Sequence, residues 1–180
     1  MGFVINTGFQ AGARSEASTS AVLTAYDAIA MSAHSYARCW VHLIWGTLNR
    51  ERLLNKNAAA ALSRYLAEYA EEQGVYMKIN FVNPDHVHVL IDLPTAVSIE
   101  KLVQLLKGSS SHWVNSSDII TGKFAWGRGY AAFSVSHSNV DAVARYIADQ
   151  REHHRVKTFT EELREFVDRH GLRRHDDKSR

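Results

Sequence analysis

The stretch NPDHVHVLIDLP, residues 83–94, decides the fold and points to a site. Its apolar residues occupy the odd positions 87–93, and His86 and His88 stand between them. Side chains two residues apart on a β-strand lie on the same face of the sheet. The alternation therefore predicts a strand that is apolar on one face and carries two imidazoles on the other.

Strands and helices on either side of this strand follow the order β-α-β-β-α-β and then two more helices. That order is typical of an α+β fold of the ferredoxin-like kind, in which two crossover helices cover one face of an antiparallel sheet. Cap residues mark several helix ends: Ser98, Asn139 and the capping box Thr158/Glu161 at starts, and Gly74 and Gly171 at ends. We expect strands over 36–48, 75–82, 86–93 and 130–136. We expect helices over 55–74, from 139 to about 153 and from 158 to 171. A further helix should begin at 98 and fray in the polar segment SSSHWVNSS.

Length and composition favour one ordinary globular domain. The chain has 180 residues, of which 46% are hydrophobic and 22% charged, and a formal net charge of +2, which neither indicates nor excludes a nucleic-acid partner. A single cysteine, Cys39, fits a reducing compartment, so we expect a cytoplasmic protein. The apolar runs are too short to span a membrane, and we expect no membrane partner.

The chain divides into three segments by composition. Residues 1–35 are rich in Ala, Ser, Thr and Gly without a sustained period, and we expect a poorly ordered N-terminal extension. Met31 is a candidate alternative start, since a chain beginning there would still contain the whole ordered pattern. Residues 36–172 form the expected domain, and 173–180 a polar tail.

Two interpretations of the histidine pair remain open from the residues alone. An isolated H-x-H motif is at least as often a pair of half-exposed surface histidines as a site. Alternatively, two neutral imidazoles on an otherwise uncovered sheet face chelate one divalent metal ion, for which a third ligand must come from elsewhere in the chain.

The segment ARYIADQREHH, residues 144–154, offers that ligand. Tyr146 and Gln150 are four residues apart and share one helix face. Tyr69 and Gln73 have the same spacing, but Tyr69 belongs to the apolar stripe of the first crossover helix, on the face away from the histidines. The later helix follows the last strand and can lie across the histidine face, docked by a separate stripe at Val140, Val143 and Ile147.

Together these motifs resemble a known family. HVHVL is similar to the His-hydrophobic-His signature of the HUH endonucleases, and its combination with a later YxxxQ helix resembles the single-tyrosine transposases. These are the TnpA type of the smallest insertion sequences, whose relatives include the REP-associated tyrosine transposases. The resemblance runs from about residue 36 to 172 and includes WVHLIWGTLNRERLL, LVQLLKGSSS, FAWGRGYAAFSVS and YIADQREHH.

The resemblance implies a specific chemistry. Tyr146 would attack a phosphodiester of single-stranded DNA, forming a 5′-phosphotyrosine and releasing a 3′-OH, and a second strand end would later reverse the bond. His86, His88 and Gln150 would hold Mg²⁺ or Mn²⁺. No nucleotide cofactor is expected, and the chain has no GxxxxGK[ST] phosphate loop. His153 and His154 are weaker candidates for a base.

Partners and departures follow from the same resemblance. It implies single-stranded and hairpin DNA as substrate and a homodimer, in which the tyrosine helix serves either its own or the partner's site. Leu48 stands where the family often has lysine, and the N-terminal extension is outside the family pattern. Candidate DNA contacts are Arg50, Arg52, Lys107, Lys123 and Arg128, with Trp126 as a ring that could stack on a base.

Three other classes compete with this interpretation. The first is a domesticated or inactive relative that binds hairpin DNA without cleaving it. The second is an RNA-recognition module on the same fold plan, which would need aromatic residues where this strand has histidines. The third is a metal hydrolase of small phosphoesters, which would use the H-x-H pair but not Tyr146.

Overall fold

The computed structural model describes residues 36–153 and 158–171. All helices and strands described below belong to one compact unit, which begins at Cys39. The expected N-terminal extension over 1–35, the polar tail over 173–180 and His154 lie outside the described residues.

A four-stranded antiparallel sheet forms the centre of this unit. Its strands are β1 (Trp40–Gly46), β2 (Tyr76–Val82), β3 (His86–Asp92) and β4 (Ala131–Ser134), in the spatial order β2-β3-β1-β4. In the β1–β3 pair, His42 lies opposite Leu90, Ile44 opposite His88 and Gly46 opposite His86. Because side chains alternate between faces, this register places the even-numbered residues of both strands on one face.

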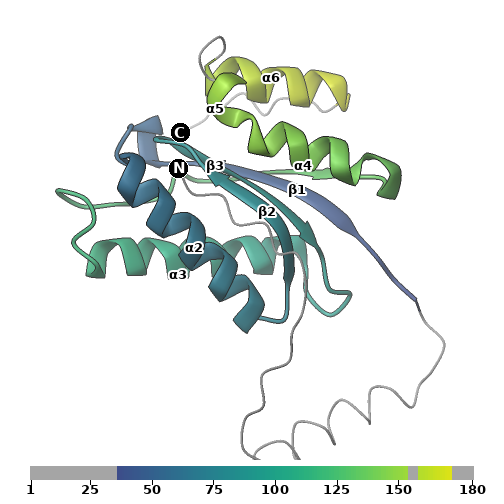
Figure 1. Ribbon diagram of the computed structural model, residues 1–180, viewed down its shortest axis with the longest axis horizontal. Coiled ribbons are helices and arrows are strands. Elements are labelled where there is room, and N and C mark those ends of the chain that lie inside the picture. Colours follow the sequence, from purple (N-terminus) through teal and green to yellow (C-terminus); the bar gives the residue numbers. More distant parts are fainter. Residues whose placement is uncertain (1–35, 154–157, 172–180) are drawn as a thin grey trace, which may run out of the picture. The chain divides into compact units, whose positions relative to one another are not determined.

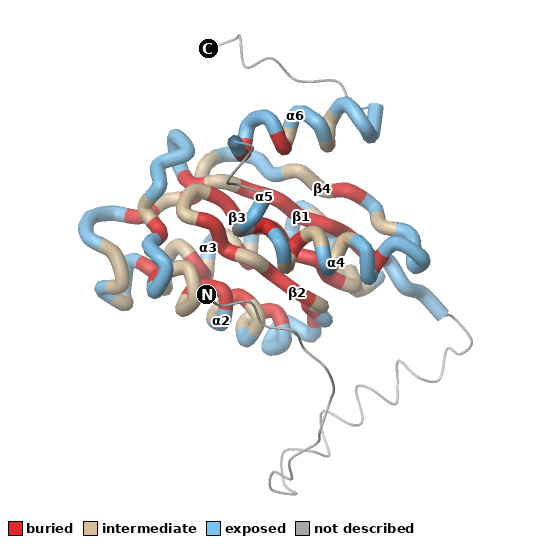
Figure 2. Tube along the Cα trace, turned by 45° about the horizontal axis from the view of Figure 1, so that its top comes forward, coloured by how far each residue is buried: buried red, intermediate tan, exposed pale blue. Residues whose placement is uncertain are grey.

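Helices cover both faces of the sheet (Figure 1). On the odd-numbered face, α2 (Lys56–Glu72) and α3 (Ile99–Ser116) form the main core with Val87, Val89 and Ile91. On the even-numbered face lie α4 (Val140–Ala148), α5 (Gln150–His153) and α6 (Phe159–Arg169). Short 3₁₀ helices at Leu48–Arg50 and His137–Asn139 complete the described elements. The central strands are therefore buried along most of their length (Figure 2).

Most predicted boundaries are confirmed within a few residues, and the caps explain why. The Ser98 hydroxyl accepts from the Lys101 N–H, Asn55 caps α2, and Thr158 and Glu161 form the predicted capping box at α6. Gly74, with φ of 69°, ends the α2 segment in the left-handed conformation that glycine tolerates. No described helix has the length and apolar character needed to cross a membrane.

Two predictions about helices were wrong. The polar run after Leu106 does not fray: α3 continues to Ser116, because Val114 is buried in the main core and Trp113 packs against it. Serine hydroxyls in this part bond within the helix, as Ser116 does to His112 O at 2.7 Å. The helix from Asn139 to His153 is broken at Asp149 into α4 and α5. Asn139 makes no side-chain cap bond and ends a 3₁₀ turn instead.

Candidate active site

Both histidines of β3 are buried. His86 is 1% exposed and His88 0% exposed, although the sequence predicted an open sheet face around them. The sequence allowed for the Tyr146 helix on this face but did not place α6 there, and α4 and α6 together bury the histidines. Buried imidazoles need polar partners, so their neighbours define the site.

Helix α4 docks where the sequence predicted. Val140 and Ile147 are buried against Trp40, Ile79 and Leu90, and Val143 packs on the same cluster. An ion pair between Lys78 and Asp141, at 3.1 Å, also joins β2 to α4. This docking places the half-buried Tyr146 beside His88, with ring centroids 6.2 Å apart.

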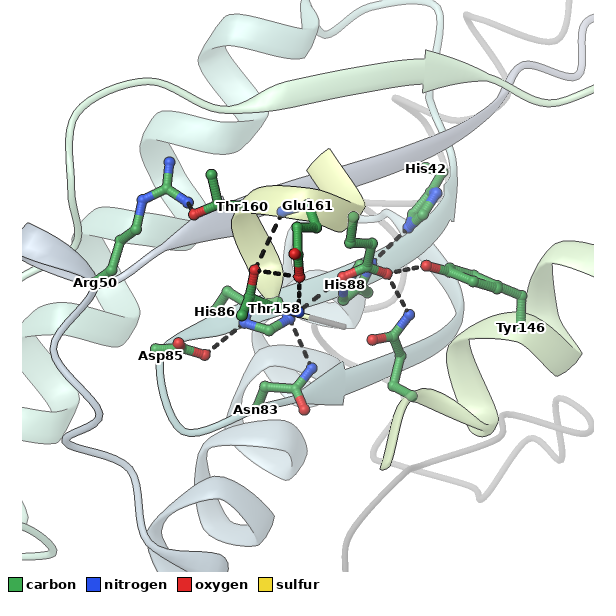
Figure 3. A network of polar contacts seen from close by, with 12 residues as sticks. His42, Arg50, Asn83, Asp85, His86, His88, Tyr146, Thr158, Thr160 and Glu161 are labelled. Atoms are coloured by element: carbon green, nitrogen blue, oxygen red, sulfur yellow. Dashed lines mark hydrogen bonds and ion pairs between the residues drawn. The ribbon is translucent and has the colours of Figure 1, made fainter. Parts of the chain in front are cut away.

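A carboxylate from α6 lies where the histidines, Tyr146 and Gln150 meet. Glu162 Oε1 accepts hydrogen bonds from Tyr146 Oη and from Gln150 Nε2, the latter at 2.8 Å. Its other oxygen, Oε2, lies 3.6 Å from His88 Nε2 and 3.9 Å from His86 Nε2. Figure 3 shows Tyr146 pointing from α4 toward His88, with His86 and His42 nearby on β3 and β1.

Helix α6 is held over the site by contacts at its first turn. The Phe159 ring stacks on His86, with centroids 4.2 Å apart and planes 16° apart. Gly46 leaves room for this ring, since a Cβ there would lie 3.3 Å from Phe159. Arg50 donates to Thr160 Oγ1 at 2.8 Å and lies over the Phe159 ring. These contacts fix the start of the helix that carries Glu162.

Neighbouring polar groups orient both imidazoles. His86 Nδ1 donates to Asp85 Oδ1 at 2.6 Å, which leaves the lone pair on Nε2, where Asn83 Nδ2 donates at 2.9 Å. His88 Nδ1 and His42 Nε2 share a hydrogen bond of 3.0 Å. When His88 is the donor, its lone pair is on Nε2, the atom nearest Glu162. Partners of this kind fix the tautomer of metal-binding histidines.

Burial shifts the protonation of two groups in the site. Loss of hydration, with a smaller contribution from His170, lowers the pKa of His42 to about 3, so this ring is neutral at physiological pH. Burial, with smaller contributions from the nearby carboxylates of Glu165 and Asp85, raises the pKa of Glu162 to about 7. The site therefore combines the neutral ring of His42 with a carboxyl group that titrates near neutral pH.

The donor set fits a divalent metal ion. His86, His88 and Glu162 each offer a ligand atom, and these atoms lie within 4.8 Å of one another. Gln150 is fully buried, and its Oε1 has no hydrogen-bond partner among the described residues. A buried amide oxygen without a donor carries a desolvation cost that a cation would relieve. Two imidazole nitrogens with such oxygens suit Mn²⁺ or Mg²⁺.

The candidate DNA-binding residues occupy varied positions. Arg52, Lys123 and Arg128 are exposed, and Arg50 is exposed beside α6. Lys107 donates to the carbonyls of Gly127 and Gly129 at 2.8 Å each, so it ties α3 to the following loop.

Trp126 differs from the sequence expectation, whereas the proposed role of the histidines after Gln150 stays a prediction. Trp126 is 9% exposed in the core, with its indole N–H donating to Ser110, which is not the exposed position that stacking on a base requires. His153 ends α5, and its side chain, like all of His154, lies outside the described residues.

Sequence reasoning missed three residues of this site: His42, Asp85 and Glu162. The first had a usable signal, since His42 stands at an even position of the strand WVHLIWG, and the pairing of β1 with β3 brings even positions to the histidine face. Asp85 was assigned only to a turn. Glu162 had no local signal beyond the capping box beside it, because its place depends on how α6 folds back.

Fold and site together define a class of protein. Its four-stranded antiparallel sheet carries an H-x-H pair, and the helices α4 and α5 that follow the last strand bring a tyrosine and a glutamine to that pair. Comparison with known families agrees with this class. Residues 35–150, well over half the chain, match the family model described as Transposase IS200 like. The chain belongs to this transposase family, which supports a DNA transposase function.

Individual relatives are consistent with the family assignment. The chain is 28% identical over 116 residues to the ISDra2 transposase TnpA of Deinococcus radiodurans, covering 62% of this chain and 83% of that protein. A crystal structure assigned as a transposase of Deinococcus radiodurans R1 matches with a TM-score of 0.52 and 27% identity, covering 66% of this chain and 96% of the other. A structure of a REP-associated tyrosine transposase bound to a REP hairpin matches with a TM-score of 0.51, covering 68% of this chain and 72% of the other. The two sequences are 14% identical, so this likeness shows the fold alone.

Proposed function

We propose that this transposase cleaves and rejoins single-stranded DNA by transesterification through Tyr146, assisted by a divalent metal ion. The observation that carries the proposal is the convergence of Tyr146, Gln150, His86 and His88 around one buried carboxylate. A phosphodiester hydrolase without a tyrosine intermediate would not need the Tyr146 hydroxyl at this position.

In the proposed cleavage step, Tyr146 Oη attacks the scissile phosphorus. A tyrosine O–P bond forms, the P–O3′ bond breaks, the tyrosine loses its proton and the departing 3′-oxygen gains one. Because one phosphoester replaces another, no nucleotide is consumed, and a second 3′-OH reverses the step to rejoin the strand. A free tyrosine has a pKa of about 10 and is therefore a weak nucleophile at neutral pH. In this proposal, Tyr146 loses its proton with the help of the neighbouring carboxylate or metal ion.

His86, His88 and Gln150 would hold the ion, through two Nε2 atoms and the amide Oε1. When bound, Mg²⁺ or Mn²⁺ would polarise the scissile phosphate and neutralise developing negative charge. Asp85 and His42 orient the two imidazoles for this task through their hydrogen bonds. The Phe159 ring stacks on His86, which is 1% exposed.

The arrangement supports further parts of the proposal. We assign the sheet to the ferredoxin-like plan, in a domain spanning 36–172, with α4 as the helix that carries the nucleophile. Tyr146 and the two histidines meet within one chain, which supports a site built from the residues of a single subunit. This holds for a monomer and for the homodimer that the family resemblance implies. A hairpin with adjacent single-stranded DNA is the proposed substrate, supported by the hairpin-bound relative.

The test is the covalent intermediate itself. The full-length protein would be incubated with Mn²⁺ and labelled hairpin oligonucleotides taken from the DNA that flanks its gene, then denatured and resolved by electrophoresis. We expect a denaturation-resistant protein–DNA adduct that Tyr146→Phe abolishes. Tyr69→Phe is the matched control, because Tyr69 has the same YxxxQ spacing but packs with Tyr65 against the opposite core.

The possible outcomes separate the competing functions. Loss of the adduct in Tyr146→Phe alone supports the proposal. Cleavage that survives intact in Tyr146→Phe contradicts it and favours a metal hydrolase. Binding of the hairpin without any adduct from the unaltered protein favours the alternative function, a domesticated or inactive relative that binds hairpin DNA without cleaving it.

A further inference from the structure

We propose that Glu162, supplied by α6, is an additional ligand of the metal ion and couples that ion to Tyr146. This inference rests on the proposed function and adds to its ligand set of His86, His88 and Gln150. The family model matches residues 35–150, so Glu162 lies outside the matched segment.

The position of Glu162 is that of a ligand rather than of a surface carboxylate. The residue is 5% exposed, and Oε2 lies 3.6 Å from His88 Nε2 and 3.9 Å from His86 Nε2. Two ligand atoms that are each about 2.1 Å from one ion lie about 3 to 4.2 Å apart. Both distances fall inside that span, so Glu162 Oε2 is close enough to share an ion with either histidine. All three ligand atoms lie within 4.8 Å of one another, so joint binding requires at most a small inward shift of the side chains.

Carboxylate chemistry adds to the case. Mg²⁺ and Mn²⁺ prefer oxygen ligands, and two histidines with one amide oxygen would supply only one. A buried carboxylate brings the negative charge that an otherwise neutral ligand set lacks. Gln150 Nε2 donates to Glu162 Oε1 at 2.8 Å, so the two side chains that offer oxygen already hold one another.

The same carboxylate also holds the nucleophile. Glu162 Oε1 accepts the hydrogen bond from Tyr146 Oη, while Oε2 faces the imidazoles. Binding of the ion through Oε2 alone would keep Oε1 available to Tyr146. Glu162 would then determine how far the attacking oxygen stands from the metal, and α6 would close on the site whenever the ion is bound.

Metal affinity tests the ligand role without relying on activity. Mn²⁺ binding to the full-length protein would be measured by isothermal titration calorimetry for the unaltered chain, Glu162→Gln, Glu165→Gln and His86→Ala. Glu165→Gln is the matched control, since it removes the same charge from an exposed position one turn along α6. We expect Glu162→Gln to weaken Mn²⁺ binding by about tenfold or more, and Glu165→Gln to change it less than about threefold.

A second measurement needs no variant. Hydrogen–deuterium exchange of the unaltered protein would be followed with and without Mn²⁺ over the amides of α6, residues 159–169. A ligand supplied by α6 must slow their exchange when the ion binds. Unchanged exchange in α6, with tight Mn²⁺ binding in the same sample, would overturn the proposal even if Glu162→Gln failed to fold.

The outcomes distinguish this inference from the proposed function. Wild-type Mn²⁺ affinity in Glu162→Gln, together with lost affinity in His86→Ala, overturns the role of Glu162 and leaves the metal site of the proposed function standing. If Glu162→Gln and His86→Ala both bind Mn²⁺ with wild-type affinity, the role of Glu162 and the proposed metal site are both overturned. If both variants bind Mn²⁺ more weakly and Glu165→Gln does not, both the role of Glu162 and the proposed metal site are supported.

Discussion

The buried carboxyl of Glu162 should make the metal-free protein lose stability as the pH rises. Its pKa is raised from 4.5 to about 7, first by burial and then by Glu165 and Asp85. The folded state therefore binds this proton more tightly than the unfolded state, so the stabilisation is complete below about pH 4.5 and is lost as the pH rises through 7. At about 1.4 kcal/mol per pKa unit, the loss between pH 5 and pH 8 is on the order of 2 to 3 kcal/mol.

Glu162→Gln removes this titration while keeping the size of the side chain. Urea unfolding at pH 5 and pH 8, in EDTA, would give the free energy of unfolding of both proteins. We expect the variant to gain on the order of 2 to 3 kcal/mol over the unaltered chain between the two pH values. Comparing the two proteins cancels the other titrating groups, including His42. Glu68→Gln, an exposed change on α2, should leave the pH dependence unchanged.

One result would refute this reasoning. If Glu162→Gln and the unaltered chain lose the same free energy of unfolding between pH 5 and pH 8, then burial does not hold the proton on Glu162. The carboxyl would in that case be ionised in the metal-free fold, stabilised by its hydrogen bonds with Tyr146 and Gln150.

Three further predictions concern the groups around this carboxyl. His42→Phe removes the hydrogen-bond partner of His88 Nδ1 and should weaken Mn²⁺ binding in calorimetry by about 10- to 100-fold. His42→Gln keeps a polar atom there and should restore part of the affinity, whereas equal losses in both variants would indicate a packing role instead. Ile147→Ala leaves a cavity at a fully buried position beneath α4 and should lower the free energy of unfolding, measured in urea, by about 2 to 5 kcal/mol. A loss below about 1 kcal/mol would contradict the observed docking of α4. Thr158→Ala removes the side-chain cap of α6 and should cost about 1 kcal/mol, seen as faster amide exchange in that helix, while Thr158→Ser should retain the protection.

Local patterns in the sequence were sufficient for much of the architecture. The alternation in HVHVLID placed the histidines on one face of β3, and the apolar stripe of Val140, Val143 and Ile147 correctly predicted that the Tyr146 helix docks on that face. Such patterns work because burial on one side of an element imposes its own periodicity on the residues. The continuation of α3 to Ser116 escaped the same reasoning, because serine hydroxyls can either compete with a helix or bond back to it.

The sequence by itself determined which residues could form the site: an H-x-H pair two apart on a strand, and Tyr146 and Gln150 four apart on a helix. Only the tertiary structure decided what surrounds them. The pairing of β1 with β3 brings His42 to His88, and the packing of Phe159 on His86 brings Glu162 to Tyr146. These contacts join residues 16 to 73 positions apart in the chain. No local period in the sequence predicts them, because they depend on how separate elements pack after each has formed.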